Sequence, residues 1–146
     1  MTDISEARQM LLNIQKNYRN GSALQFGVER KNDQAIIGTC TLHNLHLNSR
    51  RAEIGYALGR PYWRQGYMSE ALTVLINYAF ESLGLNRLEA DIDPRNAASE
   101  KLLERLGFLK EGYLRQRWIV DGEVSDSVFY GLLRSEWHNP PVQSFP

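Results

Sequence analysis

A glycine-containing turn ahead of an amphipathic helix carries the residue types best suited to chemistry in this chain. Its residues are Arg64, Gln65, Gly66, Tyr67, Met68 and Ser69. Backbone N–H groups that converge there, with the positive end of a helix dipole behind them, bind a phosphate without needing a lysine. Gly66 lets the backbone approach a ligand closely, and Ser69 can cap the helix. The turn therefore predicts an anion site, although a plain strand-to-helix turn has the same pattern.

A second helix with a polar start follows thirty residues later. Asn96 has the side chain of a typical helix cap, and the helix ends in Leu106, Gly107 and Phe108. Ser99 lies one turn after Asn96, and residues with this spacing share a helix face. We therefore expect these two polar side chains on the same side of the helix.

The segments around these two turns predict a mixed sheet with helices packed on it. Alternating apolar residues that end in turn residues indicate strands over residues 24–29, 35–42, 51–58, 87–92, 109–120 and 124–133. Apolar residues at helical spacing, with capping residues, indicate helices over residues 5–18, 66–80 and 96–106. The expected fold class is α/β (α+β), a mostly antiparallel twisted sheet flanked by helices.

Length and composition describe one ordinary globular domain, residues 1–146. Of the 146 residues, 42% are apolar and 23% charged, which suffices for one core. The 17 basic and 17 acidic side chains cancel, so no overall field recruits nucleic acid or an anionic membrane. The sequence contains no apolar run of membrane-spanning length and no signal-peptide pattern near Met1, which predicts a cytoplasmic protein.

The cysteine and histidine content predicts neither a disulfide nor a metal site. The single Cys40 has no partner for an intramolecular disulfide, and its apolar surroundings predict a small buried hydrophobe rather than a reactive thiol. No set of Cys, His and carboxylate residues has the spacing of metal ligands, so we expect no metal.

Taken together, these segments resemble the acyl-CoA-binding core of the GNAT N-acetyltransferase superfamily, most closely its ribosomal-protein-alanine (RimJ/RimL-like) branch. The likeness includes residues 35–39 and 52–56, the Gly66 turn, the Asn96 helix and residues 121–133. The order and spacing of these pieces make the resemblance specific. Relatives usually have a strand ahead of their first helix, which nothing before Asp3 can form. We therefore expect the sheet to lack its usual first strand, and a homodimer or another covered edge.

The resemblance implies that acetyl-CoA is the co-substrate and that its acetyl group passes to an amine by direct attack. The backbone amides of residues 64–69 correspond to the family's diphosphate contacts, with Arg64 and Met68 at positions that are often small. Leu58 corresponds to the strand residue whose amide polarises the thioester carbonyl, although a plain core leucine has the same pattern. Asn96 corresponds to the asparagine that binds the pantetheine arm, a role compatible with capping.

Ser99 and Glu53 are the catalytic candidates that the resemblance implies. Ser99 would donate a proton to the departing thiolate, and the alternative is a simple first-turn serine. Glu53 lies close to the position of a glutamate that accepts the amine proton through water. The alternative for Glu53 is a solvated strand residue paired with Arg50 or Arg51.

Three further residues bear on the chemistry. His43 and His46 are alternative bases by residue type, although lone histidines of this kind are more often surface residues. Trp118 stands near a position where relatives that modify ribosomal proteins often have an acidic residue. The aromatic side chain at that position weakens the prediction of a ribosomal substrate.

Three functions remain open from the sequence: acetylation of a protein or peptide α-amine, acetylation of a small amine, and binding of acyl-CoA without turnover. An α-amine with a pKa near ~7.8 is roughly a quarter neutral at about pH 7.4, whereas a lysine near ~10.4 is neutral about one time in a thousand. Only the neutral amine attacks. Since the sequence offers no convincing strong base, we predict an α-amine acceptor.

Overall fold

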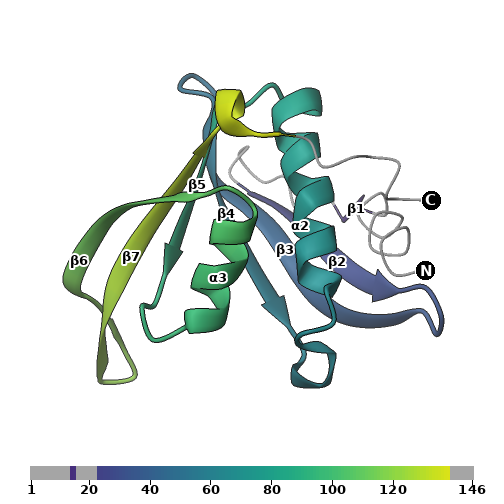
Figure 1. Ribbon diagram of the computed structural model, residues 1–146, viewed down its shortest axis with the longest axis horizontal. Coiled ribbons are helices and arrows are strands. Elements are labelled where there is room, and N and C mark those ends of the chain that lie inside the picture. Colours follow the sequence, from purple (N-terminus) through teal and green to yellow (C-terminus); the bar gives the residue numbers. More distant parts are fainter. Residues whose placement is uncertain (1–13, 16–22, 139–146) are drawn as a thin grey trace.

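The computed structural model describes residues 14–15 and 23–138, which form one mixed sheet with two helices packed on one face (Figure 1). In this part of the chain, seven strands lie in the order β1-β2-β3-β4-β5-β7-β6. Their bounds are β1 (Ile14–Gln15), β2 (Ala23–Arg30), β3 (Ala35–His46), β4 (Arg51–Leu58), β5 (Arg87–Ile92), β6 (Leu109–Val120) and β7 (Glu123–Leu133). Neighbouring strands are antiparallel, except that β4 and β5 are parallel.

Helices connect β4 to β5 and β5 to β6 along the chain. Helix α2 (Tyr67–Asn77) follows β4 and continues into the π-helical turn η2 (Tyr78–Ser82), and α3 (Ala97–Arg105) follows β5. Two short 3-10 turns, η1 (Arg60–Tyr62) and η3 (Arg134–Glu136), complete the described elements. The predicted fold class is confirmed, and β4, β5 and β6 have the predicted ends.

Both helices pack on the same face of the sheet. Cys40 and Tyr56 are register partners on β3 and β4, so their side chains share a face. Cys40 contacts Met68 of α2, and Tyr56 contacts Ser99 of α3. The cleft described below therefore lies on the face that carries both helices.

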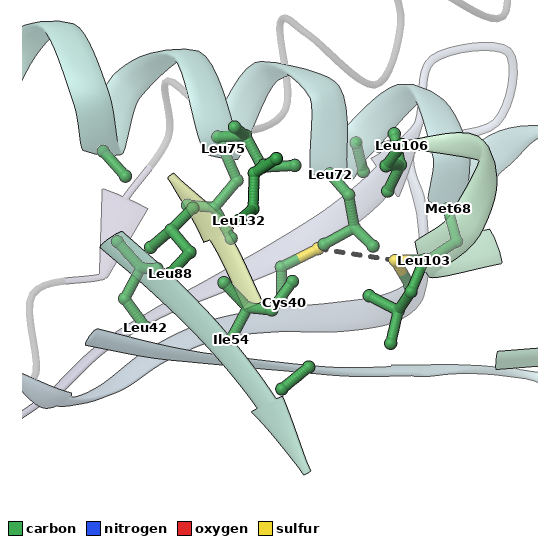
Figure 2. Packing of buried hydrophobic residues seen from close by; sticks show 14 of the residues in the cluster. Cys40, Leu42, Ile54, Met68, Leu72, Leu75, Leu88, Leu103, Leu106 and Leu132 are labelled. Atoms are coloured by element: carbon green, nitrogen blue, oxygen red, sulfur yellow. Dashed lines mark hydrogen bonds between the residues drawn. The ribbon is translucent and has the colours of Figure 1, made fainter. Parts of the chain in front are cut away.

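The core lies between this face and the two helices. Leu72 and Leu75 of α2 are at most 1% exposed, and they point toward the sheet, where Leu42 and Leu88 lie (Figure 2). Leu103 of α3 is fully buried in the same cluster. Burial of each leucine contributes roughly 1.5–3 kcal/mol, so this packing holds the helix starts in place.

Strand alternation turns polar side chains to the opposite face of the sheet. On β5, Leu88 and Ala90 are buried in the core, whereas Glu89 and Asp91 alternate with them and are only partly buried. Glu53 of β4 is the register partner of Glu89 and shares its face. We call this side, which bears Glu53, Glu89 and Asp91, the polar face.

The predicted helix over residues 5–18 is wrong at Ile14 and Gln15, which form strand β1. These residues pair with Phe26 and Gln25 of β2, whose edge offers backbone donors and acceptors that override local helical spacing. The rest of that predicted helix lies outside the described residues. The edge of β2 is thus covered at these two positions by the chain itself, and the homodimer stays a prediction.

We expect Cys40 to be inert in the folded protein. Its thiol is fully buried beside Met68 (Sγ to Sδ, 3.6 Å), and burial raises its pKa to about 12. Because the thiolate is the reactive form, a disulfide reagent at pH 8 should label native protein at least about a hundredfold more slowly than denaturant-unfolded protein. Equal labelling rates in the two states would contradict the buried placement.

Candidate functional site

Strands β4 and β5 diverge soon after they begin. Their parallel pairing consists of Arg51 with Arg87, Ala52 with Leu88, and Glu53 with Glu89. Beyond this point β4 continues along β3, while β5 continues along β7. The sheet is therefore split at its centre, between the last residues of β4 and those of β5.

The amide of Leu58 points into this split. The N–H of Gly59 donates to the carbonyl of Ile37 on β3 (2.8 Å). Successive residues of a strand direct their amides to opposite edges, so the N–H of Leu58 points away from β3. The carbonyl of Leu58 accepts from Trp63 Nε1 (2.7 Å), a contact that ties the following turn to the end of β4. This is the position expected for a donor to a thioester carbonyl.

A cleft of about 1150 Å³ opens beside the split. Its walls are the end of β4 (residues 56–58), the turn and first residues of α2 (63–64 and 66–69), and the start of α3 with its preceding loop (95–99, 101–102 and 105). The structure thus brings together most of the residues that the sequence assigned to a cofactor, and these are Leu58, Arg64, Gly66, Tyr67, Met68, Ser69 and Asn96. The catalytic candidate Ser99 lines the same cleft.

The first turn of α2 leaves backbone donors for a ligand. Gly66 is its N-cap, with φ 83°, and no side chain caps the helix. The carbonyl of Gly66 accepts the N–H of Glu70 (3.1 Å). Among the described residues, the N–H groups of Tyr67, Met68 and Ser69 have no acceptor. Unsatisfied amides at a helix N-terminus attract an anion, so the predicted phosphate site has suitable donors.

Two residues of the turn differ from the predictions. Ser69 does not cap the helix, because Gly66 begins it and Ser69 lies within its first turn, where its carbonyl accepts from Thr73 Oγ1 (2.8 Å). Gln65 is absent from the cleft wall, and its side chain donates to the carbonyl of Pro61 (2.9 Å). Arg64 has φ 63°, a left-handed conformation that glycine adopts more easily.

The charged residues on the cleft wall are all basic. They are Arg64, Arg95, Lys101 and Arg105. Arg95 is bound to Asp93 and Glu123 (2.6 and 2.8 Å), so its charge is largely neutralised. Arg64, Lys101 and Arg105 are exposed and form no ion pair with another described residue. A polyphosphate ligand therefore fits this wall both by charge and by backbone donors.

Tyr56 is a polar residue of the cleft that the sequence prediction missed. Its hydroxyl donates to Ser99 Oγ (3.2 Å), and burial raises its pKa, so it stays protonated at neutral pH. Ser99 is 9% exposed, and its N–H donates to Asn96 Oδ1 (3.1 Å), which confirms Asn96 as the helix cap. Strand alternation from Leu58 was a signal that could have placed Tyr56 on this face.

Tyr130 of β7 fixes α3 in this position. Its hydroxyl donates to Glu100 Oε2 (3.2 Å) and Glu104 Oε2 (3.4 Å), and Tyr130 itself is 1% exposed. Burial, with the two carboxylates nearby, raises the pKa of Tyr130 to about 12. The neutral phenol thus anchors the helix that carries Ser99.

Glu53 lies on the polar face, outside the cleft wall. The pairing with Arg50 or Arg51 that was its alternative interpretation is wrong, because Glu53 Oε2 accepts from Asn44 Nδ2 (2.7 Å) and Oε1 lies 3.4 Å from His43 Nε2. These partners come from β3, since Glu53 is the register partner of His43. The other histidine considered, His46, accepts the N–H of Ser49 through Nδ1 (3.2 Å).

The described part of the chain holds no group of three or more His, Cys, Asp or Glu side chains placed to ligate a metal ion. Within residues 14–15 and 23–138, neither helix has the length and apolar composition needed to cross a bilayer.

Known structures share this fold. The structure of Mycobacterium smegmatis RimJ in complex with CoA-disulfide aligns with a TM-score of 0.75 at 31% identity, over 81% of this chain and 56% of that one. A Vibrio cholerae spermidine N-acetyltransferase aligns with a TM-score of 0.77, over 85% of this chain and 73% of that one. At 22% identity, the second match shows the fold alone.

Sequence relatives point to the same family. The chain is 43% identical over 136 residues to the uncharacterized N-acetyltransferase p20 of Bacillus licheniformis, covering 93% of this chain and 76% of p20. It is 35% identical to the ribosomal protein uS5-alanine N-acetyltransferase of Escherichia coli, covering 85% of this chain and 64% of that enzyme. Residues 1–109 match the family described as the acetyltransferase (GNAT) domain, and the chain belongs to this family.

Proposed function

We propose that this protein is an acetyl-CoA-dependent N-acetyltransferase that modifies a primary amine, most favourably the α-amine of a protein or peptide. The observation that carries the proposal is the cleft beside the β4–β5 split, where free helix amides, basic side chains and the Leu58 amide face one space. Membership of the GNAT family and the likeness to a relative in complex with CoA-disulfide support the same co-substrate. We also propose that the protein is cytoplasmic.

The residues of the cleft suit the parts of a CoA thioester. The amides of Tyr67, Met68 and Ser69 would hold the diphosphate through backbone contacts, since the side chains of Tyr67 and Met68 are buried in the core. Arg64, Lys101 and Arg105 would neutralise its phosphates. The bound acetyl-CoA supplies the activated acetyl group, and we assign the pantetheine contact to Asn96.

Two groups of the protein would act on the thioester itself. The N–H of Leu58 would stabilise negative charge on the carbonyl oxygen as the amine attacks. Ser99 would donate its proton to the departing sulfur. Because the Tyr56 hydroxyl donates to Ser99 Oγ, that bond leaves the hydrogen of Ser99 unused and fixes the position of Oγ. Tyr56 is thus a positioning residue for Ser99.

The amine would reach the split from the polar face, where Glu53 would accept its proton through water. Glu53 keeps a fixed position there through Asn44 and His43. The uS5-alanine acetyltransferase relative favours a protein α-amine as acceptor. A small amine is the second candidate, since Glu53, Glu89 and Asp91 place three carboxylates on the polar face.

The acceptor preference is tested by thiol release from acetyl-CoA with a panel of amines. We expect N-terminal peptides with a free α-amine to react at least about a hundredfold faster than their N-blocked, lysine-containing counterparts, because a neutral α-amine is far more abundant near neutral pH. Faster turnover of spermidine or lysine than of every α-amine would contradict this assignment. A panel without any turnover, despite CoA binding, would contradict the enzymatic function.

Replacing Gly66 with valine should weaken CoA binding by at least about tenfold, or ~1.4 kcal/mol. A β-branched residue does not tolerate the φ of 83° and would misdirect the amides that follow. Gly84→Val is the matched control, because Gly84 has φ 68° and, like Gly66, no atom within 4 Å of an added Cβ, but lies outside the cleft wall. Calorimetry that finds equal CoA affinity for both variants would refute the diphosphate assignment.

Ser99→Ala and Tyr56→Phe should each lower kcat, Ser99→Ala by about 10²-fold, while the CoA dissociation constant changes little. If Tyr56 acts through Ser99, the double variant will be no slower than Ser99→Ala alone. Tyr78→Phe, on η2 and away from the cleft wall, is the control. Multiplicative losses in the double variant would show that Tyr56 does not work through Ser99.

A further inference from the structure

Strand β6 contains a three-residue bulge opposite a single residue of β7. Leu114 pairs with Ser127 and Trp118 pairs with Ser125, so three residues of β6 face Asp126 alone. Gln116, in the middle, has φ 54°, and its N–H donates to Asp126 Oδ1 (2.7 Å). Bulges of this kind redirect side chains and are frequent beside functional sites.

The bulge directs Arg117 into a group of side chains on the polar face. The guanidinium carbon of Arg117 lies 5.2 Å from the centre of the Trp118 ring and 5.0 Å from that of Phe129. Its Nε lies 3.7 Å from Asp91 Oδ2. Two aromatic rings and a carboxylate around one cation are the components of an ammonium-binding cage. We call Asp91, Trp118 and Phe129 the cation cage.

The cage is held together independently of Arg117. Trp118 Nε1 donates to Ser127 Oγ (2.8 Å) and approaches Asp91 Oδ2 (3.3 Å), while Ser127 is fully buried. Phe129 is the register partner of Asp91 on β7. The walls therefore come from three neighbouring strands and are fixed by contacts among themselves.

Arg117 is bound weakly enough to be replaced. Its Nε to Asp91 distance of 3.7 Å is long for a hydrogen bond, and the Arg117 side chain is 38% exposed. Asp91, at 15% exposed, is by contrast largely shielded from water. A partly exposed ion pair contributes about 1 kcal/mol or less, and each of the two cation–π contacts contributes about 0.5–1 kcal/mol. A cation that enters the cage regains the same ring contacts, so it can displace the guanidinium.

The cage adjoins the split in the sheet. Asp91 lies two residues beyond Glu89, the last residue of β5 that pairs with β4, and it shares the polar face with Glu53. A cation in the cage would thus sit beside the opening, on the side opposite the helices and the cleft. This is the side from which the proposed function brings the amine.

We propose that the cation cage is a binding site for an alkylammonium group, and that Arg117 occupies it until such a group displaces the guanidinium. The binding itself follows from the cage alone, whereas the identification of the ligand as the acceptor amine rests on the proposed function. Arg117 therefore competes with the acceptor. The apparent affinity for amines equals the intrinsic affinity of the cage multiplied by the fraction of molecules in which Arg117 has left it.

Tetramethylammonium tests the binding separately from catalysis, because it cannot be acetylated. Titration without acetyl-CoA, by NMR or calorimetry against sodium chloride at equal ionic strength, should show about tenfold tighter binding to Arg117→Ala than to the unmodified protein. Arg115→Ala, which removes the same charge from the same bulge, is the control for overall electrostatics. Asp91→Asn in the Arg117→Ala background should abolish the gain.

Arg117→Met is the control for a folding defect, because the methionine side chain still covers the two rings but carries no charge. This variant should bind tetramethylammonium no better than the unmodified protein. The proposal is overturned if Arg117→Ala has a lower melting temperature but binds tetramethylammonium no better than Arg115→Ala. That result would mean that Arg117 only stabilises the bulge. If tetramethylammonium binds as expected but no amine is acetylated, the cage stands and the proposed function falls.

Identification of the ligand as the acceptor has its own measurement. In an acetylation assay, Arg117→Ala should lower the KM for an α-amine by severalfold while kcat changes less, because the variant affects occupancy of the cage rather than the reacting atoms. Tighter tetramethylammonium binding with an unchanged amine KM would show that the cage binds some cation other than the acceptor.

Discussion

The early end of the pairing between β4 and β5 is the constraint on which the rest of this structure depends. Three residue pairs join the two strands, and after Glu53 each follows a different neighbour. The split frees the edge of β4 at Leu58 and leaves room for the cleft beside α2 and α3. A continuously paired sheet would use these backbone groups internally and would separate its two faces completely.

Because side chains alternate along each strand, the two faces that meet at the split carry different kinds of residue. Tyr56 and Leu88 face the helices, where apolar packing and the anion-binding elements lie. Glu53 and Asp91 face the other way, among side chains that suit cations. In the proposed reaction, the anionic co-substrate and the amine therefore approach one point from opposite sides, and neither has to pass the charged side chains of the other face.

The sequence predicted what depends on neighbouring residues and failed where distant segments meet. Gly66 and Asn96 begin their helices as expected, because a turn conformation and a cap involve only a few successive positions. The bond from Tyr56 to Ser99 joins residues 43 apart, and no local pattern encodes it. Likewise, Ile14 became a strand through pairing with β2, and the true partners of Glu53 followed from the register of β3.

The bulge in β6 also affects how the molecules behave in concentrated solution. Strand β6 ends the sheet, most of its residues are exposed, and Ile119 and Val120 are 70% and 60% exposed. A long regular edge with such residues is a template for strands of other molecules and a route to aggregation. Because the backbone of β6 is irregular between Leu114 and Trp118, an incoming strand finds only short regular stretches on either side. The same distortion that positions Arg117 therefore shortens the regular edge on which a strand of another molecule could pair.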